Sequence, residues 1–425
     1  MGTRSKIIGI VLIASLLSAC SNSRRAHADA AFNRMAYATA SAKYDQLLQK
    51  KFDRSIALRA AIAHSKLNDL HRAVELYGMA QKEAPLQTTD GLLYGMALQQ
   101  IGEVANAEIQ FKNILASDSG NVIAKRLLDA CYAHTSYTPA TPLYEIQPVR
   151  IPELPEAFCA VPYGKGVVFA GANASVNAKR TNPLNGHSFL DLYYGEPNAQ
   201  GDLADIKPLF GIVNGMYHDG PATFSSDGRT MFFSRSDYMK HRIIKDEQNV
   251  SHVQLFRAEK QRNGSWENVE QFAFNSDGRS IGQAALSADG RTLYMISDMP
   301  GGFGGTDVYQ CKWMLNAWSP PENLGPTINT PGNEMFPTVL GDTLFFSSNG
   351  HGGLGGLDVF SSAYTNDDWS LPANMNAPIN STYDDFSLQF RNDGSSGFLS
   401  SNRDGKDGIY SLRKLPVEQL SKAAP

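Results

Sequence analysis

The sequence predicts a multidomain α + all-β protein, in which an array of helical hairpins is followed by a five-bladed β-propeller. Three observations carry this prediction. Positions in the C-terminal part repeat at a step of 51 residues, short turn motifs recur with them, and a helical pattern repeats upstream at a step of 34 residues. Self-similarity at such periods is typical of solenoids and propellers. A chain of 425 residues is also long enough for two or three separate cores.

Composition places the chain among ordinary globular proteins. It is 42% apolar and 19% charged, with a net charge of −4, so no attraction to nucleic acid is expected. Besides Cys20 the chain contains Cys131, Cys159 and Cys311, which are widely spaced and form no C-x-x-C pair. We expect these three to be small buried apolar residues, although export to an oxidising compartment would permit a bridge.

The first residues have the features of an export signal. A positively charged start precedes an apolar stretch at 7–17, which is shorter than the roughly 20 residues of a membrane-spanning helix. The stretch ends in Leu17-Ser18-Ala19-Cys20, which resembles the lipobox of bacterial lipoproteins. The resemblance implies removal of residues 1–19, a lipid anchor on Cys20, and membrane attachment without a spanning helix. Ser21, in place of an acidic residue, favours the periplasmic face of the outer membrane. An ordinary secretory signal with a chance cysteine is the alternative.

Residues 20–30 are small, polar and basic, and we expect them to form a tether. The segment 31–135 is expected to be helical, because apolar residues recur there at i, i+3 and i+4. Its small and aromatic residues resemble a tetratricopeptide array of about three repeats, which small residues at the close helix contacts make possible. Any helical bundle would show part of this spacing. The positions that carry the resemblance are Ala40, Tyr44, Leu47, Ala73, Tyr77, Ala80, Ala107, Phe111 and Ile114.

The tetratricopeptide resemblance implies a concave groove that docks a peptide of a partner protein. The alternative is that the same side chains pack against the next domain. The candidate lining residues are Leu58, Ile62, Lys66, Met96, Gln99 and Gln100.

A Pro/Thr-rich run at 134–151 separates the helical segment from the propeller, which we place at 138–415, with a tail at 416–425. Short apolar runs are separated there by tight turns such as Asp227-Gly228 and Asp289-Gly290. Each unit is predicted to be a four-stranded meander that buries both faces against its neighbours around an axis. The last unit lacks a fourth strand, and we expect 144–151 to donate it and close the ring. Six blades are the alternative.

Two glycine-rich loops, G-G-x-G-G at 301–305 and 352–356, precede Asp307 and Asp358. Neither loop opens a helix or carries the Lys-Ser/Thr pair of a phosphate-binding loop. We expect them to be connections between strands, each fixed by its aspartate through backbone hydrogen bonds.

Alignment of the five units on their hairpin turns brings out a position that is acidic in four of them, Glu156, Asp219, Glu334 and Asp385. Repeat symmetry would gather these carboxylates at one mouth of the central channel, where they could bind a divalent cation or a basic group of a partner. The alternative is that they cap loop amides at equivalent turns. No other cofactor is predicted, and no metal site is assigned.

The sequence contains neither H-E-x-x-H nor G-x-S-x-G, and its nine histidines are scattered singly. An insertion at 236–252, rich in Lys, Arg and His, is absent from the other units. A long loop on a rigid scaffold is a usual place for recognition, and a surface excursion without a role is the alternative.

The propeller repeats resemble the WD-like repeats of the periplasmic protein of the Tol system. Together with the lipobox and the helical array they resemble PorE-like lipoproteins of the type IX secretion and gliding machinery. The resemblance implies a non-enzymatic scaffold in an outer-membrane complex, with envelope proteins, including secretion or motility components, as partners. PorE-like proteins continue into an OmpA-like domain that this sequence lacks, so peptidoglycan binding is not expected. The alternative is a propeller glycoside hydrolase or glycan-binding lipoprotein, since glycosidases need only two carboxylates brought together by the fold.

Overall fold

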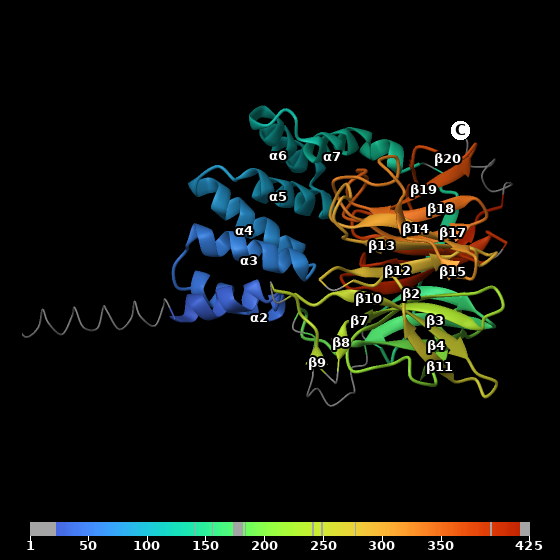
Figure 1. The fold of residues 1–425 in the computed structure, drawn as a ribbon. Coiled ribbons are helices and arrows are strands. Elements are labelled where there is room, and N and C mark those ends of the chain that lie inside the picture. Colours follow the sequence, from blue (N-terminus) through green and yellow to red (C-terminus); the bar gives the residue numbers. More distant parts are fainter. Residues whose placement is uncertain are drawn as a thin grey trace, which may run out of the picture. The chain divides into compact units, whose positions relative to one another are not determined.

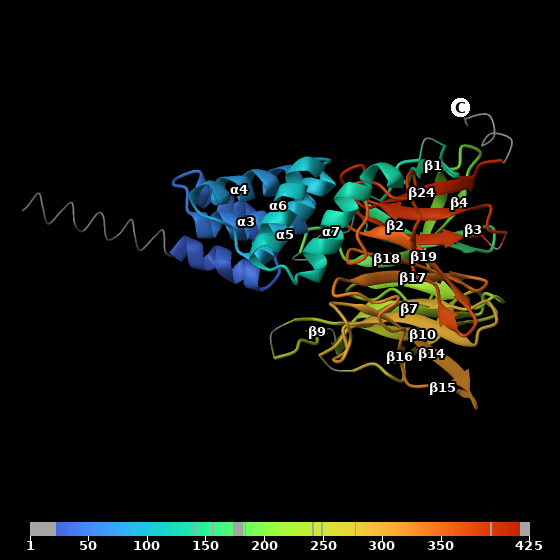
Figure 2. The same cartoon turned by 90° about the horizontal axis from the view of Figure 1, so that it is seen from above.

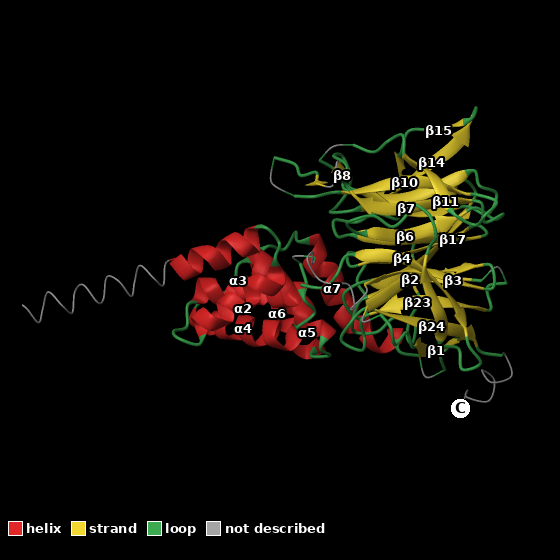
Figure 3. Cartoon of the chain, turned by 90° about the horizontal axis from the view of Figure 1, so that it is seen from below, coloured by secondary structure: helices red, strands yellow, loops and turns green. Residues whose placement is uncertain are grey.

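The computed structural model describes residues 23–416, except 140, 155, 173–181, 183, 240–241, 248–249, 277 and 392. Helices occupy the described chain up to Tyr137, and strands begin at Tyr144 (Figure 3). Cys20 with its lipobox lies outside the described residues, as does the tail beyond 416. Among the described residues, no helix is both long and apolar enough to cross a membrane.

The chain divides into two compact units, one of residues 1–98 with 181–187 and one of 99–180 with 188–425. In the first unit, α3 packs against both α2 and α4, and the predicted positions from Ala40 to Ala80 are all buried in one core. The Asp53 side chain accepts a hydrogen bond from Ile56 N and so caps the start of α3. The helices are a segment at 23–33, α2 (Tyr37–Leu48), α3 (Arg54–Lys66), α4 (Leu70–Glu83) and most of α5 (Thr88–Gln100) (Figure 1).

The segment expected to be a tether is instead helical from 23 onward. Ala28 and Ala31 are buried in the core of the first unit. Asp29 accepts a hydrogen bond from Tyr44 Oη at 2.7 Å and forms an ion pair with Arg59 at 3.1 Å. The alanines on one face of this segment therefore pack against the core. The segment as a whole has a polar composition, which is why it was predicted to be a tether.

The second unit begins with two further helices, α6 (Val104–Ser117) and α7 (Val122–Ala133), and a 3-10 turn, η1 (His134–Tyr137). The helices α6 and α7 pack against each other. The Asn121 side chain caps α7 by accepting a hydrogen bond from Ala124 N at 2.9 Å. Because α3, α5 and α7 begin at residues 54, 88 and 122, the helices follow the predicted step of 34 residues.

Five antiparallel sheets follow, as predicted, and form the blades of a propeller (Figures 1 and 2). Blade 1 contains β2 (Glu156–Tyr163), β3 (Gly166–Ala172), β4 (Leu190–Pro197) and β5 (Leu203–Pro208). Blade 2 contains β6 (Asp219–Phe224), β7 (Thr230–Ser236), β10 (Val253–Lys260) and β11 (Trp266–Gln271). Blade 3 contains β12 (Ile281–Leu286), β13 (Thr292–Ser297), β14 (Asp307–Met314), β15 (Ala317–Trp318) and β16 (Glu322–Asn323). Blade 4 contains β17 (Glu334–Leu340), β18 (Thr343–Ser348), β19 (Asp358–Thr365), β20 (Asp368–Trp369) and β21 (Ala373–Asn374).

Blade 5 is completed by the strand that the sequence analysis expected to be donated. It contains β22 (Asp385–Phe390), β23 (Ser396–Ser401), β24 (Gly408–Lys414) and β1 (Tyr144–Val149). The strand β1 pairs antiparallel with β24 over its whole length, from Tyr144 opposite Lys414 to Val149 opposite Ile409. The first strand of the propeller thus closes the ring and covers the edge of the last sheet.

Each blade buries both faces against its neighbours. In β18, Phe345 belongs to the core between blades 4 and 5, and the next residue, Phe346, belongs to the core between blades 3 and 4. Alternate residues of a strand point to opposite faces, so consecutive apolar residues fill both cores. This explains why the middle strands are apolar throughout and show no alternation.

The described part of the 236–252 insertion is a small hairpin, in which β8 (Tyr238–Met239) pairs with β9 (Arg242–Ile243). His252 Nε2 lies 2.9 Å from Asp246 Oδ2, and Asp237 N donates to His252 O. The described residues of the insertion are therefore hydrogen-bonded to one another.

Candidate functional site

The four acidic residues predicted at the channel mouth are the first residues of the innermost strands of blades 1, 2, 4 and 5. Asp219, Glu334 and Asp385 are each 0% exposed. Glu334 accepts hydrogen bonds from Thr330 N at 2.8 Å, Thr330 Oγ1 at 2.7 Å and Ser348 Oγ at 2.6 Å. Burial raises the pKa of Glu334 to about 7.

Asp219 and Asp385 are satisfied in a similar way, with one cation each. Asp385 accepts from Ser381 Oγ at 2.8 Å and pairs with Arg403. Asp219 accepts from Gly215 N and pairs with Arg235, both at 2.5 Å. These three carboxylates bond to the loops of their own blades, which is the capping arrangement given above as the alternative. Because they are enclosed, they do not form the open channel-mouth site that repeat symmetry led us to expect.

Glu156 does not belong to the same set. Each innermost strand contains a β-bulge. In blade 4 the bulge residue is Phe336, which has a positive φ of +51°, and Glu334 lies two residues before it. In blade 1 the bulge residue is Cys159, with φ +55°, so the equivalent position is Ala157. A shift of one residue moves a side chain to the other face of a strand. The predicted alignment was wrong by one residue in this blade.

No group of three or more His, Cys, Asp or Glu that could hold a metal ion occurs among the described residues. Between the innermost strands, the Phe386 ring contacts both Phe158 and Phe336, with ring centroids 6.0 and 4.8 Å apart. Aromatic side chains rather than carboxylates therefore meet where these three blades face one another.

The two glycine-rich loops have the same construction in blades 3 and 4, as predicted. Asp307 accepts hydrogen bonds from Phe303 N and Gly304 N, and Asp358 accepts from Leu354 N and Gly355 N, all between 2.6 and 3.1 Å. A Cβ atom at Gly302 or Gly353 would collide with the carboxylate, so glycine is required there. The two loops are structural twins.

The loop of blade 4 is covered by the helical part of the same unit. Gln99 is fully buried, and its Nε2 donates to Gly353 O at 2.8 Å. Arg126 of α7 donates to Gly350 O at 3.1 Å. A Cβ on Gly352 would lie 2.9 Å from Arg126 O, which shows how closely the loop and the helix approach. At the tip of the loop Leu354 is only 2% exposed.

Among the described residues, no segment covers the twin loop of blade 3 in this way. Residues 301–305 are all exposed, and Phe303, the equivalent of Leu354, is 44% exposed. An aromatic side chain at the tip of a rigid loop is the kind of residue that dominates protein–protein interfaces. The two loops therefore have the same hydrogen bonds, but only the blade 4 loop is covered by helical residues.

The residues predicted to line a peptide groove are not brought together as one set. Leu58 and Ile62 are partly buried against the core of the first unit, and Lys66 is exposed on the same helix. Gln99 and Gln100 instead bond to the propeller, with Gln100 Nε2 3.3 Å from Asp384 Oδ1. Met96 lies one turn earlier on α5 and is partly exposed.

A repeated asparagine that was not predicted from the sequence holds the third strand of each of the first four blades. In blade 3, Asn329 Oδ1 accepts from Val308 N at 2.8 Å, and its Nδ2 donates to Val308 O at 3.0 Å. The recurring Ile-Asn pair at 328–329 and 379–380 was the available signal. We call these residues the clamp asparagines. They are Asn214 on Leu192, Asn275 on Leu255, Asn329 on Val308 and Asn380 on Val359.

Blade 5 has no clamp asparagine, because β1 pairs with β24 at the equivalent place, with Val149 opposite Ile409.

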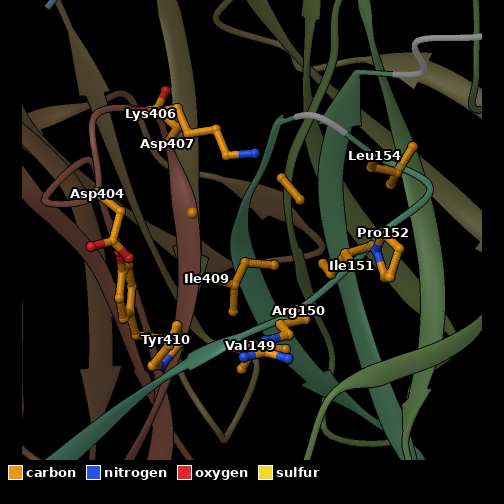
Figure 4. A pocket seen from close by; sticks show the side chains of 13 residues that line it. Val149, Arg150, Ile151, Pro152, Leu154, Asp404, Lys406, Asp407, Ile409 and Tyr410 are labelled. Carbon is orange, nitrogen blue, oxygen red and sulfur yellow. The ribbon is translucent and has the colours of Figure 1, made fainter.

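A pocket of about 390 Å³ lies at this seam between β1 and β24. It is bounded by the 148–154 segment on one side and by β24 and the loop before β24 on the other. Figure 4 shows the Lys406 side chain directed across the pocket, with Asp404 and Tyr410 beside each other on the same side as Lys406, and with Ile151, Pro152 and Leu154 on the opposite side. We call it the seam pocket. Its size is within the range of small-ligand sites.

The seam pocket combines an apolar wall with ionisable groups. Val149, Ile151 and Leu154 form the wall. Tyr410 Oη donates to Asp404 Oδ2 at 2.7 Å. Burial, together with the charges of Glu156 and Asp384, raises the pKa of Asp407 to about 7. A carboxyl group near half-protonation can either donate or accept a hydrogen bond at neutral pH.

The solved structures to which the chain is similar are distant from it, and no conclusion is drawn from them. No protein-family model matches the chain, and no curated protein matches it significantly. A putative TolB from Agrobacterium tumefaciens is 10% identical with a TM-score of 0.30, covering 50% of this chain and 65% of that one. The chain thus spans just under two thirds of that structure. A β-1,2-mannobiose phosphorylase from Listeria innocua is 10% identical with a TM-score of 0.41, covering 67% of this chain and 94% of that one. An α-L-arabinofuranosidase from Lactobacillus brevis is 13% identical with a TM-score of 0.41, covering 63% and 93%.

Proposed function

We propose that the chain is a lipid-anchored, non-enzymatic scaffold that holds envelope proteins together at the periplasmic face of the outer membrane. Cys20 would carry the anchor, as the lipobox implies. The resemblance to PorE-like lipoproteins favours a complex linked to type IX secretion or gliding. The helical repeats would serve as a tetratricopeptide-like array, and the propeller would offer a second docking surface.

The observation that carries the proposal is the difference between the twin loops. The chain itself uses the blade 4 loop as a protein-docking surface, through Gln99, Arg126 and the close approach of α7 to Gly352. The blade 3 loop has the same backbone bonds and is bare, with Phe303 at its tip. A rigid loop needs little ordering on binding, so it can bind a partner at low entropic cost. We propose that a helix of a partner protein covers the blade 3 loop.

The buried carboxylates support the same conclusion. A glycosidase needs two carboxyl groups that reach the substrate and have different environments. Glu334 and Asp385 are instead enclosed and bonded to their own blades.

The experiment that tests the proposal is purification of the affinity-tagged protein from membranes under mild detergent, with and without the substitution Phe303→Asp. We expect one or more envelope proteins to co-purify with the unsubstituted chain and to be lost with Phe303→Asp. The control is Leu371→Asp, because Leu371 is 84% exposed and lies in blade 4 outside the loop. Equal recovery of partners with both variants would contradict the role of the blade 3 loop.

Glycan binding or hydrolysis is the second candidate, and the seam pocket is the observation that favours it. Asp404 and Asp407 line that pocket, and Asp407 has a raised pKa, as a general acid requires. Incubation of the purified protein with envelope and dietary glycans tests this candidate. If sugars are released by the unsubstituted protein and not by the Asp407→Asn variant, the protein is a hydrolase and the scaffold proposal is wrong. We expect no release.

A further inference from the structure

The hairpin between β14 and β15 in blade 3 has an unusual tip. Its turn residues, Leu315 and Asn316, have φ values of +50° and +64°. Two consecutive residues of positive φ form the tight type I′ turn, which favours Asn, Asp and Gly. Blade 4 provides the comparison, because its hairpin turns at Asn366 and Asp367 with nearly the same φ values, +54° and +63°.

Leu315 is therefore a bulky residue in a conformation that its twin, Asn366, adopts more easily. It is also 98% exposed, so packing within the described residues does not account for it. Strained, exposed residues are retained most often where they serve a function. Among the described residues, Leu315 therefore has almost no packing partner.

The residues beside Leu315 extend the apolar tip. Trp313 is 43% exposed and Met314 is 56% exposed, and Lys312 next to them is exposed as well. The equivalent positions of blade 4 are Tyr364 and Thr365. The Trp313 ring contacts Trp318 across the hairpin, with centroids 5.2 Å apart, so the base of the tip is held in place. Figures 2 and 3 show the hairpin extending beyond the other strands of its blade.

We infer that this tip, Trp313-Met314-Leu315, inserts into the surface of a lipid leaflet. The tip is convex, with its apolar side chains on a two-residue turn, and a fluid lipid layer accepts such a shape without a preformed groove. Tryptophan favours the boundary between headgroups and acyl chains, and a neighbouring lysine is attracted to anionic headgroups. The inference rests on the proposed membrane attachment, which would keep a leaflet within reach. The tip would be a second, weaker contact beside the N-terminal lipid.

An environment-sensitive fluorophore at the tip tests the inference. The chain from Ser21 onward contains every described helix and strand, and its cysteines, Cys131, Cys159 and Cys311, are all buried. Leu315→Cys therefore provides a selective attachment site for a nitrobenzoxadiazole label. The matched control is Asn366→Cys, at the equivalent turn of blade 4. An N-terminal histidine tag bound to nickel-chelating lipids would hold each variant on vesicles of phosphatidylethanolamine and phosphatidylglycerol.

We expect the label at position 315 to shift to shorter emission wavelength on the vesicles and to be quenched by spin-labelled acyl chains. The label at position 366 should show neither change. Adding Met314→Thr, the residue of the twin hairpin, should reduce the shift at position 315. Equal emission of the two labels on vesicles would overturn the inference, as would a shift at 315 caused only by an added envelope protein. Because the tag supplies the tether, a failure here leaves the lipidation of Cys20 and the Phe303 result untouched.

Discussion

Each of the first four blades carries one clamp asparagine, which bonds both polar groups of a backbone residue in the neighbouring strand. Asn329 and Asn380 are each 1% exposed, whereas Asn214 and Asn275 are partly exposed. Loss of one clamp leaves a buried N–H and a buried C=O without partners, and each costs free energy. The clamp is therefore a residue-scale device that fixes the loop between one blade and the next.

The substitution Asn329→Ala is expected to lower the free energy of unfolding of the propeller by about 3 kcal/mol. Denaturation followed by tryptophan fluorescence measures this, because all four tryptophans lie in the propeller. Asn113→Ala, on an exposed face of α6, is the control and should change the stability by less than about 0.5 kcal/mol. A loss for Asn329→Ala no larger than that of the control would refute the clamp.

The raised pKa of Glu334 predicts that the free energy of unfolding depends on pH. Its pKa in the folded protein is about 7, above the ordinary 4.5, so the folded state holds a proton that the unfolded state has lost between these values. Protonated Glu334 therefore contributes its full stabilisation of the folded state below pH 4.5. As the pH rises from 4.5 to about 7, this contribution to the free energy of unfolding is lost, and the loss is up to about 3 kcal/mol.

Glutamine can replace the protonated carboxyl group, because Thr330 and Ser348 can accept from its amide through their hydroxyl groups. We therefore expect Glu334→Gln to reduce the fall in unfolding free energy between pH 5 and pH 7.5. Glu322→Gln, at an exposed position of blade 3, should leave that fall unchanged. The account of Glu334 fails if the two variants have the same pH dependence.

At the scale of elements, the strand β1 closes the ring. Ile146 packs in the core between blades 4 and 5, while its neighbour Gln147 is exposed. We expect Ile146→Asn to lower the unfolding free energy by about 2–3 kcal/mol, because it places an amide in an apolar core. Gln147→Asn on the opposite face should be close to neutral. Equal effects of the two substitutions on tryptophan-monitored denaturation would show that β1 does not hold the ring.

The elements that repeat were the ones the sequence could predict. The 51-residue step located blades 3 and 4, the Asp-Gly turns located the hairpins of blades 2 and 3, and the missing fourth strand of blade 5 located β1. The aspartates of the glycine-rich loops were predicted correctly for the same reason. The buried state of Cys131, Cys159 and Cys311 also agreed with the prediction.

Features that depend on register or on tertiary contacts could not be predicted. Glu156 was placed one residue out of register with Glu334, and an error of one residue reverses the face of the strand on which a side chain lies. The residues near 28 read as a tether because their buried alanines are visible only once a core is present. Likewise, Gln99 has the same spacing whether it lines a groove or bonds to Gly353, and only the fold distinguishes the two.

At the scale of the molecule, the proposed scaffold role depends on the surfaces that the propeller offers to partners. Asp219, Glu334 and Asp385 are bonded within the propeller, the glycine-rich loop of blade 4 is covered by helical residues of the same unit, and the twin loop of blade 3 is exposed.

The proposed function also requires the chain to be attached to a membrane. Mass spectrometry of the membrane fraction should find Cys20 as an acylated N-terminus, and Cys20→Ser should release the protein from that fraction.

The most direct test of the central claim is photo-crosslinking in intact cells, with a photoreactive phenylalanine derivative at position 303. The account predicts a discrete cross-linked product with another envelope protein, and no such product when the probe replaces Leu371. Cross-links from position 303 only to this chain's own helices, or none at all, would contradict a scaffold that binds a partner through the blade 3 loop.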